Sequence, residues 1–147
     1  MKKIVIFILL ASFFGCCKFV MEPVDFAWPV ESVLDISDDG NVSDARFSFT
    51  ANVKGLFLEE KEDAKSYKKE SVRIIRDTKG FYYMVAAGFK NVYVFNVVDG
   101  TFELENKIKV SDFGLDLPAF NQRAPFIELL EGEKHLAFLT SDGIKGE

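Results

Sequence analysis

The chain has 147 residues, of which 48% are hydrophobic and 28% are charged, and its formal net charge at pH 7 is −5. This length fits one domain with enough apolar residues to bury a core. The acidic balance argues against nucleic acid or an anionic lipid surface as a partner.

The first seventeen residues have the order of a secretory signal peptide. Lys2 and Lys3 form a basic start, residues 4–14 are apolar or small, and Gly15 precedes Cys16. About eleven such residues make a helix of roughly 16 Å, whereas a transmembrane helix needs about twenty residues. We therefore expect a cleaved signal rather than a permanent anchor. Losing both lysines takes the net charge from −5 to −7.

The residues at the cut resemble the signal of bacterial lipoproteins. In that family a large aliphatic residue and two small ones precede a Cys, and the matching positions here are Phe13, Phe14, Gly15 and Cys16. The resemblance implies cleavage after Gly15 and lipidation of Cys16, which fixes the protein to a membrane through several acyl chains. Cys17 is the alternative site of modification. An ordinary cleaved signal that leaves two free cysteines is the other interpretation.

The same resemblance implies a location in the cell. Cys17 occupies the second mature position, where an Asp in Gram-negative relatives is an inner-membrane retention signal. We therefore expect a lipid-anchored protein of the cell envelope, at the outer membrane. Residues 1–15 are then the signal peptide, 16–28 a lipidated tether, and 29–147 a single β-rich domain. Both cysteines lie at the cut, so we expect no disulfide in the domain.

The first half of the domain has a sequence pattern typical of β-strands, interrupted by one charged stretch. Alternating apolar residues predict strands over 30–36 and 46–53, and the second extends to residue 60 with Gly55 as a bulge or bend. Residues 59–71 are rich in Glu, Ala and Lys. This composition is compatible with a long loop or with one or two solvated helical turns. We favour the helical turns.

The second half contains the strongest strand signals. Branched and aromatic residues predict strands over 72–76, 81–89, 91–97 and 101–110, with Asp99 and Gly100 as a hairpin turn and Asn106 at a bulge. Two more strands meet at Glu131 and Gly132. We expect an all-β fold with room for one short helix, built as a small antiparallel β-sandwich or a barrel-like meander.

Residues 72–110 also resemble the middle of a β-propeller blade, where one strand ends in Asp-Gly and the next leads out. Any β-meander gives this pattern. A propeller needs at least about four blades, and this chain has room for about two. The resemblance therefore implies a fragment of a propeller at most.

Part of a calcium-loop pattern lies between residues 35 and 46. Oxygen-bearing side chains occupy its first, third, fifth and ninth positions, namely Asp35, Ser37, Asp39 and Ser43. Gly40 occupies the sixth position, but Arg46 stands at the twelfth in place of the bidentate Glu. The pattern is compatible with a calcium site as the only cofactor, and it favours a plain Asp/Gly-rich turn.

Residues 111–125 predict a long irregular segment that lies on the domain. Its apolar side chains are candidate contacts for a protein partner, because aromatic residues in an ordered loop are natural anchors. They are Phe113, Leu115, Leu117 and Phe120.

The sequence argues against an enzyme. His135 is the only histidine, lies in an apolar run, and is predicted to be packed within a strand. No zinc ligand set, strained nucleophile motif or phosphate loop is present. We expect a lipid-anchored structural or adaptor protein that binds another envelope protein or itself. The alternatives are a small-ligand or calcium-binding domain, a fragment of a β-propeller, and a hydrolase of cell-wall glycans.

Overall fold

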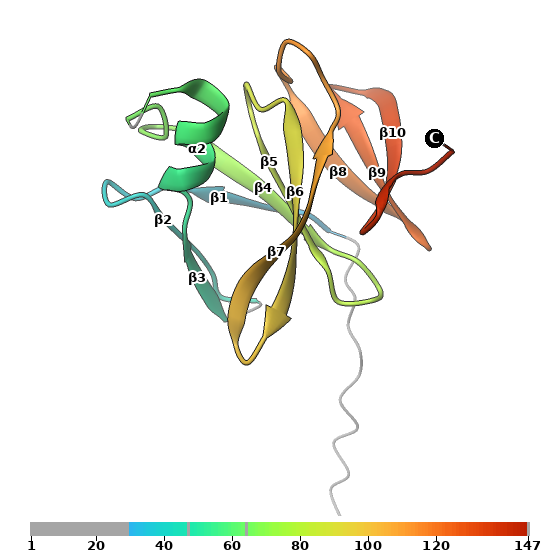
Figure 1. The fold of residues 1–147 in the computed structure, drawn as a ribbon, viewed down its shortest axis with the longest axis horizontal. Helices are drawn as coiled ribbons and strands as arrows, with labels where there is room; N and C mark the ends of the chain where they lie inside the picture. Colours follow the sequence, from blue (N-terminus) through green and yellow to red (C-terminus); the bar gives the residue numbers. More distant parts are fainter. Residues whose placement is uncertain (1–29, 47, 64, 147) are drawn as a thin grey trace, which may run out of the picture.

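A computed structural model describes residues 30–46, 48–63 and 65–146 (Figure 1). The signal segment and the expected lipidation at Cys16 lie outside the described residues. Within the described residues the fold is antiparallel and mostly β, with one helix, as the sequence predicts. None of that part of the chain forms a helix long and apolar enough to cross a membrane.

The strands form three open antiparallel sheets. The orders are β1-β4-β5-β6-β7, β11-β10-β9-β8 and β2-β3. The elements are β1 (Ser32–Asp35), β2 (Asn41–Asp44), β3 (Phe49–Asn52), α2 (Lys54–Lys61), β4 (Ser71–Arg76), β5 (Tyr82–Ala86), β6 (Asn91–Val98), β7 (Thr101–Lys109), β8 (Pro118–Arg123), β9 (Phe126–Glu131), β10 (Lys134–Thr140) and β11 (Gly143–Ile144).

The five-stranded sheet is the middle layer of a sandwich-like arrangement. Figure 1 shows the four-stranded sheet on one side of it, and α2 with β2 and β3 on the other. On the first side, the Asn106 amide of β7 donates to the Ser141 carbonyl at 3.0 Å. On the second side, Ser32 of β1 donates to Asp44 of β2. Because both faces of this sheet are covered, β4, β5 and β6 are largely buried.

The helix α2 occupies a segment for which the sequence predicts a strand. Gly55 is therefore not a bulge but lies in the first turn of α2. Residues 54–61 are mostly Leu, Glu and Lys, which have high helix propensity, and Phe57 is fully buried beneath the helix. The helix ends at Lys61, and the next residue, Glu62, has a left-handed backbone. Residues 65–69 of the charged stretch form turns, in which Tyr67 is buried and donates to the Asp38 carbonyl.

The segment predicted as irregular over 111–125 is only half irregular. Residues 111–117 form a loop, and Pro118–Arg123 form β8, an edge strand. The Ser111 hydroxyl accepts hydrogen bonds from the main-chain N–H groups of Phe113 and Gly114. Gly114 has a φ of +97° and packs so closely on Gly88 that a Cβ would lie 2.7 Å from the Gly88 carbonyl oxygen. The loop is therefore fixed to the domain.

The hairpin between β6 and β7 forms as predicted. Asp99 and Gly100 both have positive φ, 50° and 78°, which is what a two-residue hairpin turn with the strand twist requires. Val94 pairs with Asn106 and Phe95 with Leu104, so the extra residue is Glu105. The bulge therefore lies one residue before the predicted Asn106.

Candidate functional site

One row of side chains crosses the middle sheet on the side that α2 and β3 cover. Strand pairing places Arg76 opposite Tyr82, Tyr82 opposite Phe95, and Phe95 opposite Leu104. Residues directly opposite each other in antiparallel strands share a face. The row therefore runs on one face from β4 to β7.

The end of this face is left partly uncovered. Val97 pairs with Phe102, and alternation along β6 puts Val97 on the same face as Phe95. We call Phe95, Val97, Phe102 and Leu104 the apolar strip. Val97 is 43% exposed and Leu104 55% exposed, so the covering layer of β3 and α2 stops short of the edge of the sheet.

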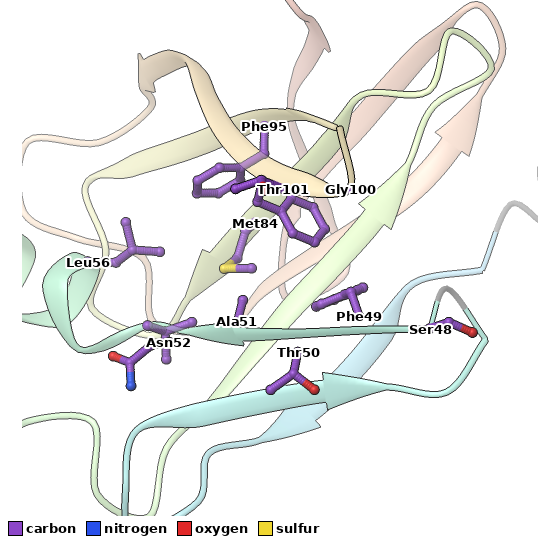
Figure 2. A pocket seen from close by; sticks show the side chains of 12 residues that line it. Ser48, Phe49, Thr50, Ala51, Asn52, Leu56, Met84, Phe95, Gly100 and Thr101 are labelled. Carbon is purple, nitrogen blue, oxygen red and sulfur yellow. The ribbon is translucent and has the colours of Figure 1, made fainter. Parts of the chain in front are cut away.

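A cleft of about 520 Å³ lies where β3 and the apolar strip face each other. Phe49 and Ala51 of β3 form one wall, Leu56 of α2 and Phe95 form the other, and Met84 of β5 lies at the base. Figure 2 shows Ala51 extending from β3 towards Met84, with the Thr50 side chain on the opposite side of the strand. The twelve lining residues are all uncharged.

Aromatic contacts close one end of the cleft. The Phe102 ring meets those of Phe49, Tyr82 and Phe95 edge-to-face, with centroids 4.7, 5.0 and 5.9 Å apart. Such pairs contribute about 0.5–1.5 kcal/mol each beyond their burial. Burial raises the pKa of Tyr82, Arg76 partly offsets that rise, and Asp44 adds to it. The Tyr82 ring is therefore neutral at physiological pH.

The main-chain edge of β3 beside the cleft has no strand partner in the part of the chain that the structure describes. The Val53 N–H donates to the Gly40 carbonyl at 2.9 Å. Since hydrogen-bonded and non-hydrogen-bonded pairs alternate in antiparallel strands, the polar main-chain groups of Thr50 and Asn52 point away from β2. Within the described residues, β3 pairs only with β2, and no main-chain hydrogen bond to Thr50 or Asn52 is formed across this edge.

These features define what the site can do chemically. Its lining offers apolar contact, and the β3 edge offers N–H donors and carbonyl acceptors at the strand spacing. Without an ionisable side chain among the lining residues, the cleft is suited to binding an uncharged apolar group rather than to proton transfer.

The candidate calcium residues take part in a turn and a strand pair. The Ser37 N–H donates to the Asn41 carbonyl at 2.9 Å, and the Ser37 hydroxyl accepts from the Asn41 N–H. The Ser43 hydroxyl instead contacts Thr50 Oγ1 at 3.0 Å. Asp35 is exposed at the end of β1 and Asp39 in the turn. Across the described ranges no cluster of His, Cys, Asp and Glu could hold a metal ion.

The four candidate partner contacts are split by the fold. Leu115 and Phe120 are buried in the core, so they do not offer a surface. Phe113 is 97% exposed and Leu117 68% exposed. Both lie outside the cleft lining, and no local sequence pattern indicates that cleft.

His135 lies on β10 as predicted, but the expectation that it is packed is wrong. Its side chain is nearly half exposed, and Nδ1 lies 3.1 Å from Glu128 Oε1. Burial raises the pKa of Glu128, but hydrogen bonds from Arg123, His135 and Asn121 outweigh this and hold the pKa below its usual value. Glu128 itself is largely buried, with a side chain that is 12% exposed, and its carboxylate contacts all three of these partners.

Comparison with protein-family models, with curated proteins and with solved structures finds no match for this chain. The arguments for a function therefore rest on the geometry of the cleft.

Proposed function

We propose that this protein is a lipid-anchored envelope protein that binds an extended apolar segment of a protein partner in the cleft. The observation that carries the proposal is the free edge of β3 beside the apolar strip. An extended chain aligned with β3 satisfies the main-chain groups of Thr50 and Asn52. Strand addition of this kind obtains affinity from main-chain hydrogen bonds and specificity from alternate side chains.

The apolar strip supplies the second half of the recognition. Alternate side chains of an added strand point to opposite faces, so one set lies against Leu104 and Val97 while the other faces water. Burying exposed apolar surface contributes about 25 cal/mol per Å². The preferred partner segment therefore alternates apolar and polar residues. The lipoprotein-like signal at Cys16 supports the other part of the proposal, the attachment of this protein to the membrane.

The test is crosslinking in intact cells with Thr50→Pro and Thr50→Ala. Proline removes the outward N–H of Thr50 and blocks strand addition, yet an edge strand accepts proline at such a position. Alanine removes only the hydroxyl that contacts Ser43. We expect the proline variant to lose its crosslinked partner and the alanine variant to retain it. A folded Thr50→Pro protein with an unchanged partner would refute the proposal.

The cleft volume favours one second candidate, a small apolar ligand. Ligand sites typically measure about 300–1,000 Å³, and this cleft measures about 520 Å³. Such a ligand does not need the β3 edge. It predicts that apolar compounds raise the melting temperature equally in wild type and Thr50→Pro, and that Phe95→Asp abolishes the rise.

A further inference from the structure

We infer that two copies of this chain associate about a two-fold axis, each inserting Phe113 into a socket beside Leu117 of the other. The socket is a cavity of about 180 Å³ between the start of β4, the end of β5 and the start of β8. Figure 1 shows the loop 111–117 at the end of β7 away from the β6–β7 hairpin that borders the cleft. This surface is therefore separate from the cleft, and the inference goes beyond the proposed function.

Phe113 is an aromatic residue that a rigid loop holds in solvent. It is 97% exposed, although the chain beside it is fixed. The Leu115 N–H donates to the Phe89 carbonyl at 3.0 Å, and the Leu115 carbonyl accepts from the Gly88 N–H at 2.6 Å. A loop that is already ordered loses little conformational freedom on binding. An exposed aromatic ring on such a loop is therefore suited to insertion into a partner.

The socket beside this loop is also preformed. The Glu31 carboxylate joins the strands that form its walls, because it accepts from Arg73 of β4 and, at 2.8 Å, from the Phe120 N–H of β8. Glu131 Oε1 fixes the rim by accepting from the Leu117 N–H at 2.8 Å. The socket therefore needs no rearrangement of its walls to accept a side chain.

The size and the lining of the socket suit one phenyl ring. A cavity of about 150 Å³ can hold benzene, and the socket measures about 180 Å³. Its apolar lining comes from Ala86, Ala87, Leu117 and Pro118. The Arg73 guanidinium also lines the socket, and a guanidinium is attracted to the face of an aromatic ring. An inserted ring thus loses contact with water without leaving a polar group of its own unpaired.

A second copy of the chain supplies the matching group. Phe113 does not line the socket of its own copy. A projecting group and a socket on one surface complement each other about a two-fold axis, because each copy gives and receives the same contact. The exposed Lys109–Asp112 ion pair adjoins Phe113, and carboxylates of Glu70 and Asp116 line the socket. The cation beside the ring therefore meets opposite charge across the contact.

The first test replaces Phe113 with photoreactive 4-azidophenylalanine in the full chain and irradiates intact cells. One side chain inserted from each copy is a small contact, so we expect a weak association that crosslinking can trap. The expected product has twice the mass of the chain and joins position 113 to Ala86, Ala87 or residues 116–118. Leu58 of α2 is the matched control position, since it is 50% exposed and lies outside the socket. A link to another protein or to another part of a second copy, or the absence of a doubled product, overturns the inference.

The second test measures how much of one tagged copy is crosslinked to a differently tagged copy. Phe113→Asp removes the inserted ring but keeps the socket, whereas Ala87→Phe fills the socket but keeps the ring. We expect each variant to capture itself at least tenfold less than wild type does. Co-expression of the two variants should restore part of the capture, because one ring then meets one intact socket.

Melting temperatures show whether the variants are folded, and Phe113→Asp should melt as wild type does because residue 113 is almost fully exposed. Self-capture of folded Phe113→Asp at the wild-type level overturns the inference. So does a mixture of the two folded variants that captures no more than either variant alone.

Discussion

The Tyr93 hydroxyl of β6 donates to Glu60 Oε1 of α2 at 2.8 Å and joins the helix to the middle sheet. The same carboxylate accepts from the Lys90 N–H and the Asn91 amide, each at 2.7 Å. Tyr93 is fully buried. Burial, with the Glu60 hydrogen bond and charge, raises the pKa of Tyr93, so its hydroxyl remains a donor. This contact fixes α2 and therefore the position of Leu56 in the cleft.

Glu60→Ala should lower the free energy of unfolding by about 3 kcal/mol, because it leaves the buried Tyr93 hydroxyl without its acceptor. The matched control is Glu59→Ala. Glu59 pairs with Lys107 at the surface, where both side chains are nearly half exposed, so we expect a much smaller loss of stability. Urea denaturation of both variants measures the difference. Equal losses of unfolding free energy in the two variants would contradict the stabilising role of the hydrogen bond between Tyr93 and Glu60.

Glu128 should make stability depend on acid pH. Its folded pKa lies below the ordinary value of 4.5. The carboxylate therefore contributes stability that is fully present above about pH 4.5 and is lost as the pH falls through the folded pKa. Glu128→Gln should flatten the melting temperature below pH 4.5 relative to wild type. Glu133→Gln, at an exposed turn, is the control and should leave the slope unchanged.

Two glycines should respond oppositely to alanine. Gly55 lies inside α2, and no atom lies within 4 Å of the position that a Cβ would take there, so Gly55→Ala should stabilise the protein by about 0.5–1 kcal/mol. Gly114→Ala should destabilise it, since the new methyl group clashes with the Gly88 carbonyl and φ is +97°. Thermal melts check both signs. A destabilised Gly55→Ala protein would favour the strand that the sequence predicts there.

Local pattern was sufficient for the elements with regular alternation. Strands β4 to β7 and the Asp99-Gly100 turn follow from branched and aromatic residues in register with a two-residue loop. The local pattern gave a wrong prediction at α2. There Leu56 and Phe57 continue the run of apolar residues that begins in β3, although the neighbouring residues favour a helix. It also failed at β8, because an edge strand tolerates the leading Pro118 and several polar residues.

The cleft could not be predicted from local pattern, because it depends on pairing between distant segments. Phe49 and Phe102 are far apart in sequence but their rings lie 4.7 Å apart. The edge of β3 is free because, among the described residues, β2 is its one strand partner. That depends on how the other strands pair, which the residues of β3 do not indicate. The exposed Leu104 has the same alternation as a buried residue, and only the limited extent of the covering layer leaves it in solvent.

Cys16→Ser should release the protein from the membrane fraction, whereas Cys17→Ser should not. Each methylene buried in the bilayer contributes about 0.8 kcal/mol, and several acyl chains on one residue make attachment effectively irreversible. Cell fractionation with a high-salt wash separates this anchoring from electrostatic adsorption, which salt screens. Mass spectrometry of the native protein should find an acylated N-terminal Cys16. Detection of an intact Met1 without an acyl group would contradict the membrane attachment in the proposed function. The proposed binding in the cleft, and its Thr50→Pro test, would be unaffected.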